Sequence, residues 1–195
     1  MAVSRNVELI LNTQTSLDVQ VGAAIGGGDR IRLISGEAAV RKNGTASTVE
    51  LVAGAGLILL SAGSVGVRRS EGRYCVTCTE GKAQVQHPQR NLVLRAGERV
   101  WYDADSLKSV ALIDLEQAQA WHRGMVVFRA TPLTEAVAEI NRYRSGRVML
   151  MNDELARKRL SGQFRIGALD EAVVQIQQIF GATVTQLPAD VVVLS

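Results

Sequence analysis

The sequence contains an internal repeat near its C-terminal end, and this repeat constrains the fold more than any other feature. Residues 128–148 align with residues 164–184 without a gap, so that Leu133 falls on Leu169 and each counterpart lies 36 residues further on. In both copies apolar residues recur at spacings of three and four, which predicts an amphipathic helix followed by a short strand. The repeat therefore predicts a duplicated β-α-β unit whose helices cover a sheet with their apolar sides. The matched pairs are Phe128 and Phe164, Arg129 and Arg165, Leu133 and Leu169, Glu135 and Glu171, Ala136 and Ala172, Val137 and Val173, Ile140 and Ile176, and Val148 and Val184.

Start and stop signals bound the two predicted helices. Thr131 is placed to cap the first helix, with Pro132 at its first position, and the helix is expected to run to about Tyr143. Gly181 closes the second helix. The strands expected in this part of the chain cover residues 147–151, 183–185 and 191–194.

The first part of the chain has a different pattern. Short apolar runs are separated by Gly, Asn or charged residues roughly every 8 to 12 residues, which is typical of short strands joined by turns. We expect turns at Asn12-Thr13, Ser35–Glu37, Glu80–Lys82 and Ala96–Glu98. The predicted fold class is mixed: an all-β domain of solenoid-like short strands at 1–113, a linker at 114–123, and a small α+β domain with duplicated β-α-β units at 124–195.

One uncharged stretch, from Leu51 to Val67, raises the question of a membrane span. Its length lies at the bottom of the spanning range of about 17–25 residues, and glycines dilute its hydrophobicity. We interpret it as two buried strands joined by a turn rather than as a spanning helix. The N-terminus shows no cleavable signal sequence.

The charge balance argues against nucleic-acid binding. The 22 Lys and Arg residues and 19 Asp and Glu residues leave a net charge of only +3, and the basic residues are dispersed along the chain. Nucleic-acid-binding proteins concentrate positive charge on one face or add aromatic side chains that stack on bases. Aromatic residues make up only 4% of this sequence.

Cys75 and Cys78 form a Cys-x-x-Cys motif, which redox pairs and zinc sites share. A zinc site needs two more ligands, and the only histidines, His87 and His122, lack a ligand-pair spacing. A redox pair needs a helix N-terminus, whereas residues 74–79 are rich in β-branched residues and predict a strand. Because residues three apart in a strand face opposite sides, we interpret both as ordinary strand cysteines.

No catalytic, cofactor or metal site can be assembled from the remaining polar residues. A Ser or Cys nucleophile needs a histidine base, but His87 is expected on the surface in a turn and His122 at the domain junction beside Trp121. Residues 26–29 resemble a phosphate-binding loop only superficially, because no Gly-Lys-Ser/Thr follows and no helix opens there. Residues 103–105 lack the further ligands of a calcium loop. We predict a non-enzymatic chain that uses no cofactor and no metal.

A longer motif runs through the first copy of the repeat. It consists of a Trp, a basic residue and a Gly before a hydrophobic strand with Phe, then Pro-Leu, then Asn-Arg-Tyr at the helix end. The residues concerned are Trp121-His122-Arg123-Gly124, Phe128, Pro132-Leu133 and Asn141-Arg142-Tyr143, with the later strand Leu160–Phe164. This motif resembles the FecR family of anti-sigma regulators. Weaker signatures at residues 11–13, 32–38 and 80–85 agree with the resemblance, which covers nearly the whole chain.

The resemblance implies a function in cell-surface signalling. FecR-like proteins are single-pass inner-membrane regulators with a cytoplasmic anti-sigma segment, one spanning helix and a periplasmic region. That region resembles an all-β domain followed by an α+β module of the STN type. It receives a signal from the N-terminal signalling domain of a TonB-dependent outer-membrane transducer, usually for an iron chelate. The signal changes the control of an extracytoplasmic-function sigma factor.

The sequence departs from this family pattern at its start. It begins within the β domain, without the cytoplasmic segment or the spanning helix. We therefore expect a periplasmic fragment that contacts the membrane and the sigma factor only through those missing parts, with a naturally short homologue as the alternative. The Cys-x-x-Cys motif is not part of the family pattern.

Two groups of residues are candidates for binding a partner protein. Val191 and Val193 belong to a short terminal strand that is expected at a sheet edge, where a partner strand can add. Arg142, Arg144 and Arg147 cluster at the first helix–strand junction and offer charge complementarity. The plain alternative for the arginines is a solvated helix C-terminus.

A structural or assembly module of a secretin-like or receptor-like envelope protein is the alternative function, because such proteins also carry STN-type modules. The residues do not identify the signal, the sigma factor or the oligomeric state.

Overall fold

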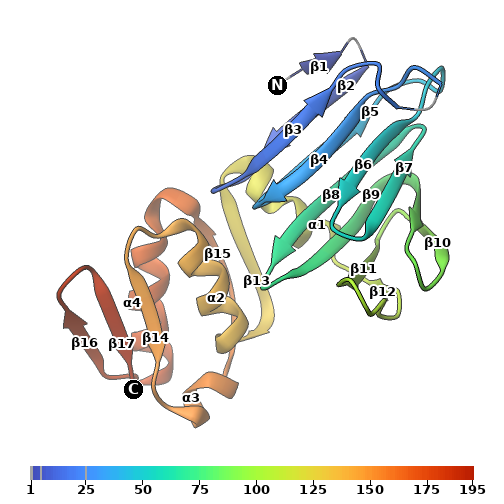
Figure 1. Ribbon diagram of the computed structural model, residues 1–195. Helices are drawn as coiled ribbons and strands as arrows, with labels where there is room; N and C mark the ends of the chain where they lie inside the picture. The colour runs from blue at the N-terminus through green and yellow to red at the C-terminus, as the bar shows by residue number, and fades with distance from the viewer. Residues whose placement is uncertain (1, 5, 25) are drawn as a thin grey trace. The chain divides into compact units, whose positions relative to one another are not determined.

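The computed structural model describes residues 2–4, 6–24 and 26–195, and its elements are labelled in Figure 1. The chain is a strand-rich mixture of helices and sheets. It divides into two compact units, the first ending at Leu115 and the second beginning at Glu116. The predicted linker, 114–123, holds two short helices, α1 (Leu115–Gln119) and the 3-10 helix η1 (Ala120–Arg123).

In its described residues, the first unit is a 12-stranded sheet that folds over on itself at β9 (Arg73–Gln86). The first half of β9 pairs with β8 and β11, and the second half pairs with β7 and β10, so the sheet forms two layers (Figure 1). The other strands are β1 (Ala2–Ser4), β2 (Val7–Leu11), β3 (Ser16–Gln20), β4 (Arg30–Ser35), β5 (Glu37–Lys42), β6 (Val49–Ala53), β7 (Gly56–Leu60), β8 (Gly63–Ser70), β10 (Asn91–Arg95), β11 (Glu98–Tyr102) and β12 (Ala111–Leu112).

The two layers enclose one hydrophobic core. Alternate residues of each strand point inward, as the period of a strand requires. Leu9 and Val76 contribute from one layer, Ile31 and Ile58 from the other, and all four side chains are buried. Within the described residues the strand pairs are antiparallel except for β4 and β6, so the unit lacks the parallel stacking of a regular solenoid.

The turn expected at Glu80–Lys82 is wrong, because β9 continues through these residues. Gly81 has a φ of +74°, and the ladder with β8 shifts register next to it. Opposite it, a Cβ on Gly63 would lie 2.2 Å from the carbonyl oxygen of Glu80. The glycines therefore allow a bulge that bends β9 from one layer into the other instead of ending it.

The Leu51–Val67 stretch forms strands, as expected. It includes parts of three strands, β6, β7 and β8, where two were expected. Among the described residues no helix is long and apolar enough to cross a membrane.

The second unit contains the repeat. The first copy is β13 (Met125–Pro132), α2 (Leu133–Tyr143) and β14 (Arg147–Leu150), and the second is β15 (Arg159–Arg165), α4 (Leu169–Phe180) and β16 (Val184–Leu187). Equivalent helix positions are equally buried, for example Ile140 and Ile176 at 0% exposure. The helices α3 (Asp153–Arg157) and η2 (Ile166–Ala168) and the strand β17 (Val191–Leu194) complete the unit. The predicted duplication of β-α-β units is therefore present in the structure.

The strands of the second unit form two small sheets, β13-β15 and β14-β17-β16. Helix α2 packs against β13 and β15 of one sheet and against β14 of the other, so a single core joins helices and sheets. In the β13-β15 ladder Val127 pairs with Gln163, its own counterpart in the repeat. The centre of the Phe128 ring lies 5.9 Å from that of its counterpart Phe164. The two copies are thus related by a local twofold axis at this ladder.

Two expectations for this unit are wrong. Helix α2 begins at Leu133, with Pro132 at the cap position, because Thr131 and Pro132 still pair with β15 as part of β13. Strand β17 lies in the centre of its sheet, between β14 and β16, and not at an edge. Local patterns do not report which strands pair, and the chain end returns to insert between two earlier strands.

Candidate protein-interaction surface

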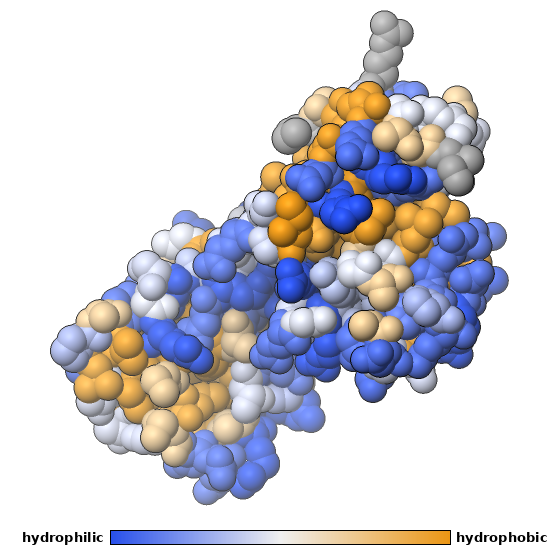
Figure 2. All heavy atoms as spheres, viewed as in Figure 1, coloured by the Kyte–Doolittle hydropathy of each residue, from blue (hydrophilic) through white to orange (hydrophobic). Residues whose placement is uncertain are grey.

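The outer face of the three-stranded sheet is apolar. Val148, Val192 and Leu194 point into the core, and the alternate residues of the same strands point away from it. Met149 and Leu187 are exposed at 40% and 47%. Figure 2 shows hydrophobic side chains gathered over this sheet. The outer row consists of Met149 on β14, Val191 and Val193 on β17, and Leu187 on β16, which the pairing register places side by side.

The structure therefore places Val191 and Val193 on a sheet face, half-buried between their neighbours. The predicted role in binding a partner remains a prediction, but its stated reason, an edge position, does not hold. Contact with a partner would have to use the side chains of these valines, because the backbone of β17 is hydrogen-bonded on both sides.

The three arginines do not form a free basic cluster. Arg142 pairs with Glu139 at 2.7 Å, and its guanidinium lies 5.4 Å from the centre of the Tyr143 ring. The Arg144 side chain is only 8% exposed and reaches Asp170 at 3.0 Å and Asp190 at 3.2 Å. It therefore links the end of α2 to the start of α4 and to the β16-β17 turn.

Arg147 is the arginine of the three that faces solvent, at the start of β14. Within the described part of the chain it forms no ion pair. The charge complementarity predicted for this cluster therefore concentrates on Arg147.

Asn141 closes the outer edge of β14. Its amide Nδ2 donates to the carbonyl oxygen of Val148 at 2.8 Å, and its Oδ1 accepts from the backbone N–H of Val148 at 2.7 Å. The side chain thus occupies the backbone groups that a neighbouring strand would use. The sequence contained the signal, an Asn in the last turn of a helix before a strand, but only as part of the longer motif.

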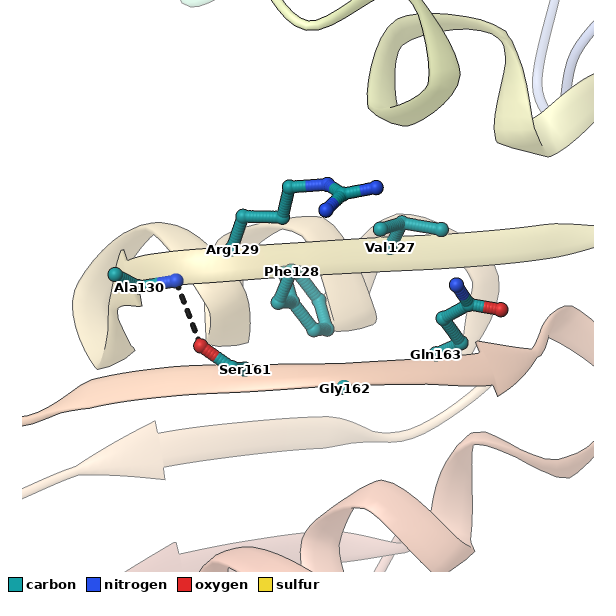
Figure 3. A pocket seen from close by; sticks show the side chains of 7 residues that line it. All are labelled: Val127, Phe128, Arg129, Ala130, Ser161, Gly162 and Gln163. Carbon is teal, nitrogen blue, oxygen red and sulfur yellow. Dashed lines mark hydrogen bonds between the residues drawn. The ribbon is translucent and has the colours of Figure 1, made fainter.

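A shallow depression of about 490 Å³ lies over the β13-β15 ladder (Figure 3). The ladder shifts register there, Ala130 has a φ of +47°, and its N–H is held by the Ser161 hydroxyl oxygen at 2.8 Å. Arg129 forms an ion pair with Glu116 of α1. The depression is lined by Val127, Phe128, Arg129, Ala130, Ser161, Gly162 and Gln163. This lining provides no base beside the serine, and therefore no activated nucleophile.

His87 is buried, contrary to the surface position expected for it. Its Nε2 donates to the carbonyl oxygen of Asp103 at 2.9 Å, and its Nδ1 accepts from the N–H of Gln89 at 3.3 Å. Its ring packs on that of Tyr102, 5.4 Å away. Both ring nitrogens are therefore engaged in holding two loops together. His122 lies beside Trp121, with the ring centres 4.2 Å apart.

The remaining polar motifs have structural roles. Cys75 and Cys78 are unbridged and buried in β9, and burial raises the pKa of both thiols. The Asp103 carboxylate accepts hydrogen bonds from the Ser106 hydroxyl and from the N–H groups of Asp105 and Ser106, which lower its pKa. Among the residues that the structure describes, no three His, Cys, Asp or Glu side chains are grouped so that they could hold a metal ion.

The whole chain is similar to solved structures. A crystal structure of a candidate anti-sigma factor from Parabacteroides distasonis ATCC 8503 matches with a TM-score of 0.79 and 16% identity, over 97% of this chain and 90% of that one. A second crystal structure of a candidate anti-sigma factor from the same organism matches with a TM-score of 0.68 and 14% identity, over 96% and 98%.

The chain has an anti-sigma-factor-like fold. No family model matches the sequence, and no curated protein matches it. At these identities the likeness concerns the fold alone. Because it extends over both units, it covers the β structure as well as the repeat.

Proposed function

We propose that this chain is the periplasmic sensor region of a transmembrane anti-sigma regulator of the FecR type. In this proposal it binds the N-terminal signalling domain of a TonB-dependent outer-membrane transducer and thereby controls an extracytoplasmic-function sigma factor. The observation that carries the proposal is the match to a candidate anti-sigma factor over 97% of the chain. The motif from Trp121 to Tyr143, which resembles the FecR family, supports it independently.

The surfaces described above favour protein binding over chemistry. The outer face of the three-stranded sheet exposes apolar side chains, and such faces are typical of interaction sites. His87, Asp103 and Arg144, which are of residue types that enzymes use, hold loops together or form ion pairs. A role in iron or siderophore signalling, a periplasmic location and an inner-membrane anchor follow from the resemblance and are part of the proposal.

Calorimetry with the full chain tests the proposal. The titrant is the signalling domain of the transducer encoded beside this gene, and the signalling domain of an unrelated transducer from the same genome is the control. We expect a dissociation constant of about 1 μM or lower for the cognate domain, which corresponds to roughly 8 kcal/mol, and no measurable heat of binding for the control. Absence of binding to the cognate domain would overturn the proposal.

A transcription measurement separates the regulator from a structural module. If the chain belongs to a regulator, deletion of its gene changes transcription from promoters of the cognate sigma factor when the inducing chelate is added. An assembly module of a secretin-like or receptor-like protein would leave that transcription unchanged.

A further inference from the structure

The two copies of the repeat treat their outer strand edges differently. In the first copy Asn141 bonds to both backbone groups of Val148 and closes the edge of β14. The counterpart of Asn141, 36 residues on, is Gln177, and the counterpart of Val148 is Val184. The Gln177 side chain is exposed and, among the described residues, forms no hydrogen bond with a protein group. Within the described residues, the second copy therefore has no counterpart of the side-chain hydrogen bonds that occupy the edge of β14 in the first copy.

The pairing of β16 with β17 fixes which backbone groups of β16 are free. Thr183 and Ser195 exchange two hydrogen bonds, of 2.8 and 3.0 Å. In an antiparallel ladder, every second residue bonds to the partner strand and the residues between direct their N–H and C=O groups to the other side. Val184 and Gln186 are those intermediate residues. No described strand pairs with that side of β16.

The edge of β16 is short and ends before Pro188, but its four residues lack the other features that normally prevent strand addition. Proteins protect exposed edges with charged side chains, prolines or bulges. The strand Val184–Leu187 contains no charged residue and no proline, and its ladder with β17 has no register shift. Its outward-facing Leu187 continues the apolar face formed by Val191, Val193 and Met149.

We propose that β16 is the docking edge of this chain, where an extended segment of the signalling domain adds as a fourth strand. This inference rests on the function proposed above. The N–H and C=O groups of Val184 and Gln186 form the hydrogen bonds to the incoming backbone. Because side chains alternate along a strand, the incoming segment is uncharged with apolar residues at every second position, which extend the face beyond Leu187.

A pair of substitutions at one residue tests the edge. Gln186→Pro removes an outward N–H, and it leaves the ladder with β17 intact because that N–H does not bond to β17. Gln186→Ala removes the same side chain but keeps the N–H. In titrations of the full chain with the signalling domain, we expect Gln186→Pro to weaken binding at least about tenfold and Gln186→Ala to change it less than about twofold.

Amide exchange in the unsubstituted chain provides a measurement that does not depend on the folding of a variant. On addition of the signalling domain, we expect exchange of the Val184 and Gln186 amides to slow at least about tenfold as their N–H groups become bonded. The amides of Thr185 and Leu187 already bond to β17 and should change much less.

The outcomes separate this inference from the function on which it rests. If the unsubstituted chain does not bind the signalling domain, the proposed function fails. If it binds, but Gln186→Pro behaves like Gln186→Ala and the Val184 and Gln186 amides stay unprotected, only the docking edge fails. If the chain alone forms a dimer in sedimentation measurements and Gln186→Pro abolishes it, the occupant of the edge is a second copy, which overturns the assignment of the signalling domain.

Discussion

Two side chains, those of Asn141 and Arg144, bond to groups on other elements of the second unit. Asn141 satisfies both backbone groups of Val148, and Arg144 holds two aspartates that lie on different elements. A buried backbone group without a partner costs more free energy than a hydrogen bond returns when it forms. These two residues therefore matter more to stability than their position near the surface suggests.

Replacing Asn141 should destabilise the chain. Asn141→Ala leaves the half-buried edge of β14 without its partner, and we expect the free energy of unfolding to fall by about 1–3 kcal/mol. Urea denaturation followed by circular dichroism measures the loss. Gln177→Ala is the matched control, because Gln177 is exposed at the equivalent position, and it should change the stability by less than about 0.5 kcal/mol. Equal effects of the two substitutions would contradict the closing role of Asn141.

The helices and strands differ in how far the sequence predicts them. The period of apolar residues predicted α2 and α4 almost to the residue, and Gly181 marked the end of α4, because these signals are local. The continuity of β9 through Gly81 and the central position of β17 were not predicted, because both depend on strands that are distant in the sequence.

The candidate site was predictable only in part. The predicted α+β domain at 124–195 placed strands 147–151 and 191–194 together, but no local pattern shows that Asp190 binds Arg144, which lies 46 residues earlier. The role of Asn141 likewise depends on the position of β14, because its side-chain amide can bond to the edge of a strand only where that strand lies next to it.

The C-terminal end of α4 depends on one glycine. Gly181 has a φ of +66°, and apart from the two adjoining residues no atom lies within 4 Å of the place where a Cβ would stand. Gly181→Ala should therefore cost about 1 kcal/mol of stability through backbone strain alone. Gly167→Ala is the control, because that glycine also has open space but no positive φ, and it should be neutral within about 0.5 kcal/mol in the same urea experiment. A neutral Gly181→Ala would show that the helix end tolerates an ordinary residue.

Across the whole chain, stability divides between two cores. The core of the first unit and that of the second have no residue in common. Each core therefore has its own set of buried contacts, and a cavity in one removes contacts from that one alone. The 97% match to a single solved chain shows that both units belong to one shared fold.

A matched pair of core substitutions tests how far the two cores are independent. Ile140 and Ile58 are both fully buried, one in each core, and each change to Ala should cost about 2–5 kcal/mol. In hydrogen-exchange mass spectrometry, Ile140→Ala should speed exchange in peptides after Glu116 and leave those of β4 to β9 unchanged. Ile58→Ala should do the reverse. Faster exchange throughout the chain in either variant would show that the cores unfold together.

The ladder between β13 and β15 pairs the two copies of the repeat symmetrically. Because Val127 pairs with its own counterpart Gln163, the contact between the two copies is the kind that two identical chains form in a symmetric homodimer. The second unit thus has the geometry of a fused dimer of a single β-α-β peptide. Fusion frees the two halves to diverge, and the difference between Asn141 and Gln177 is an example of such divergence, which a true homodimer could not contain.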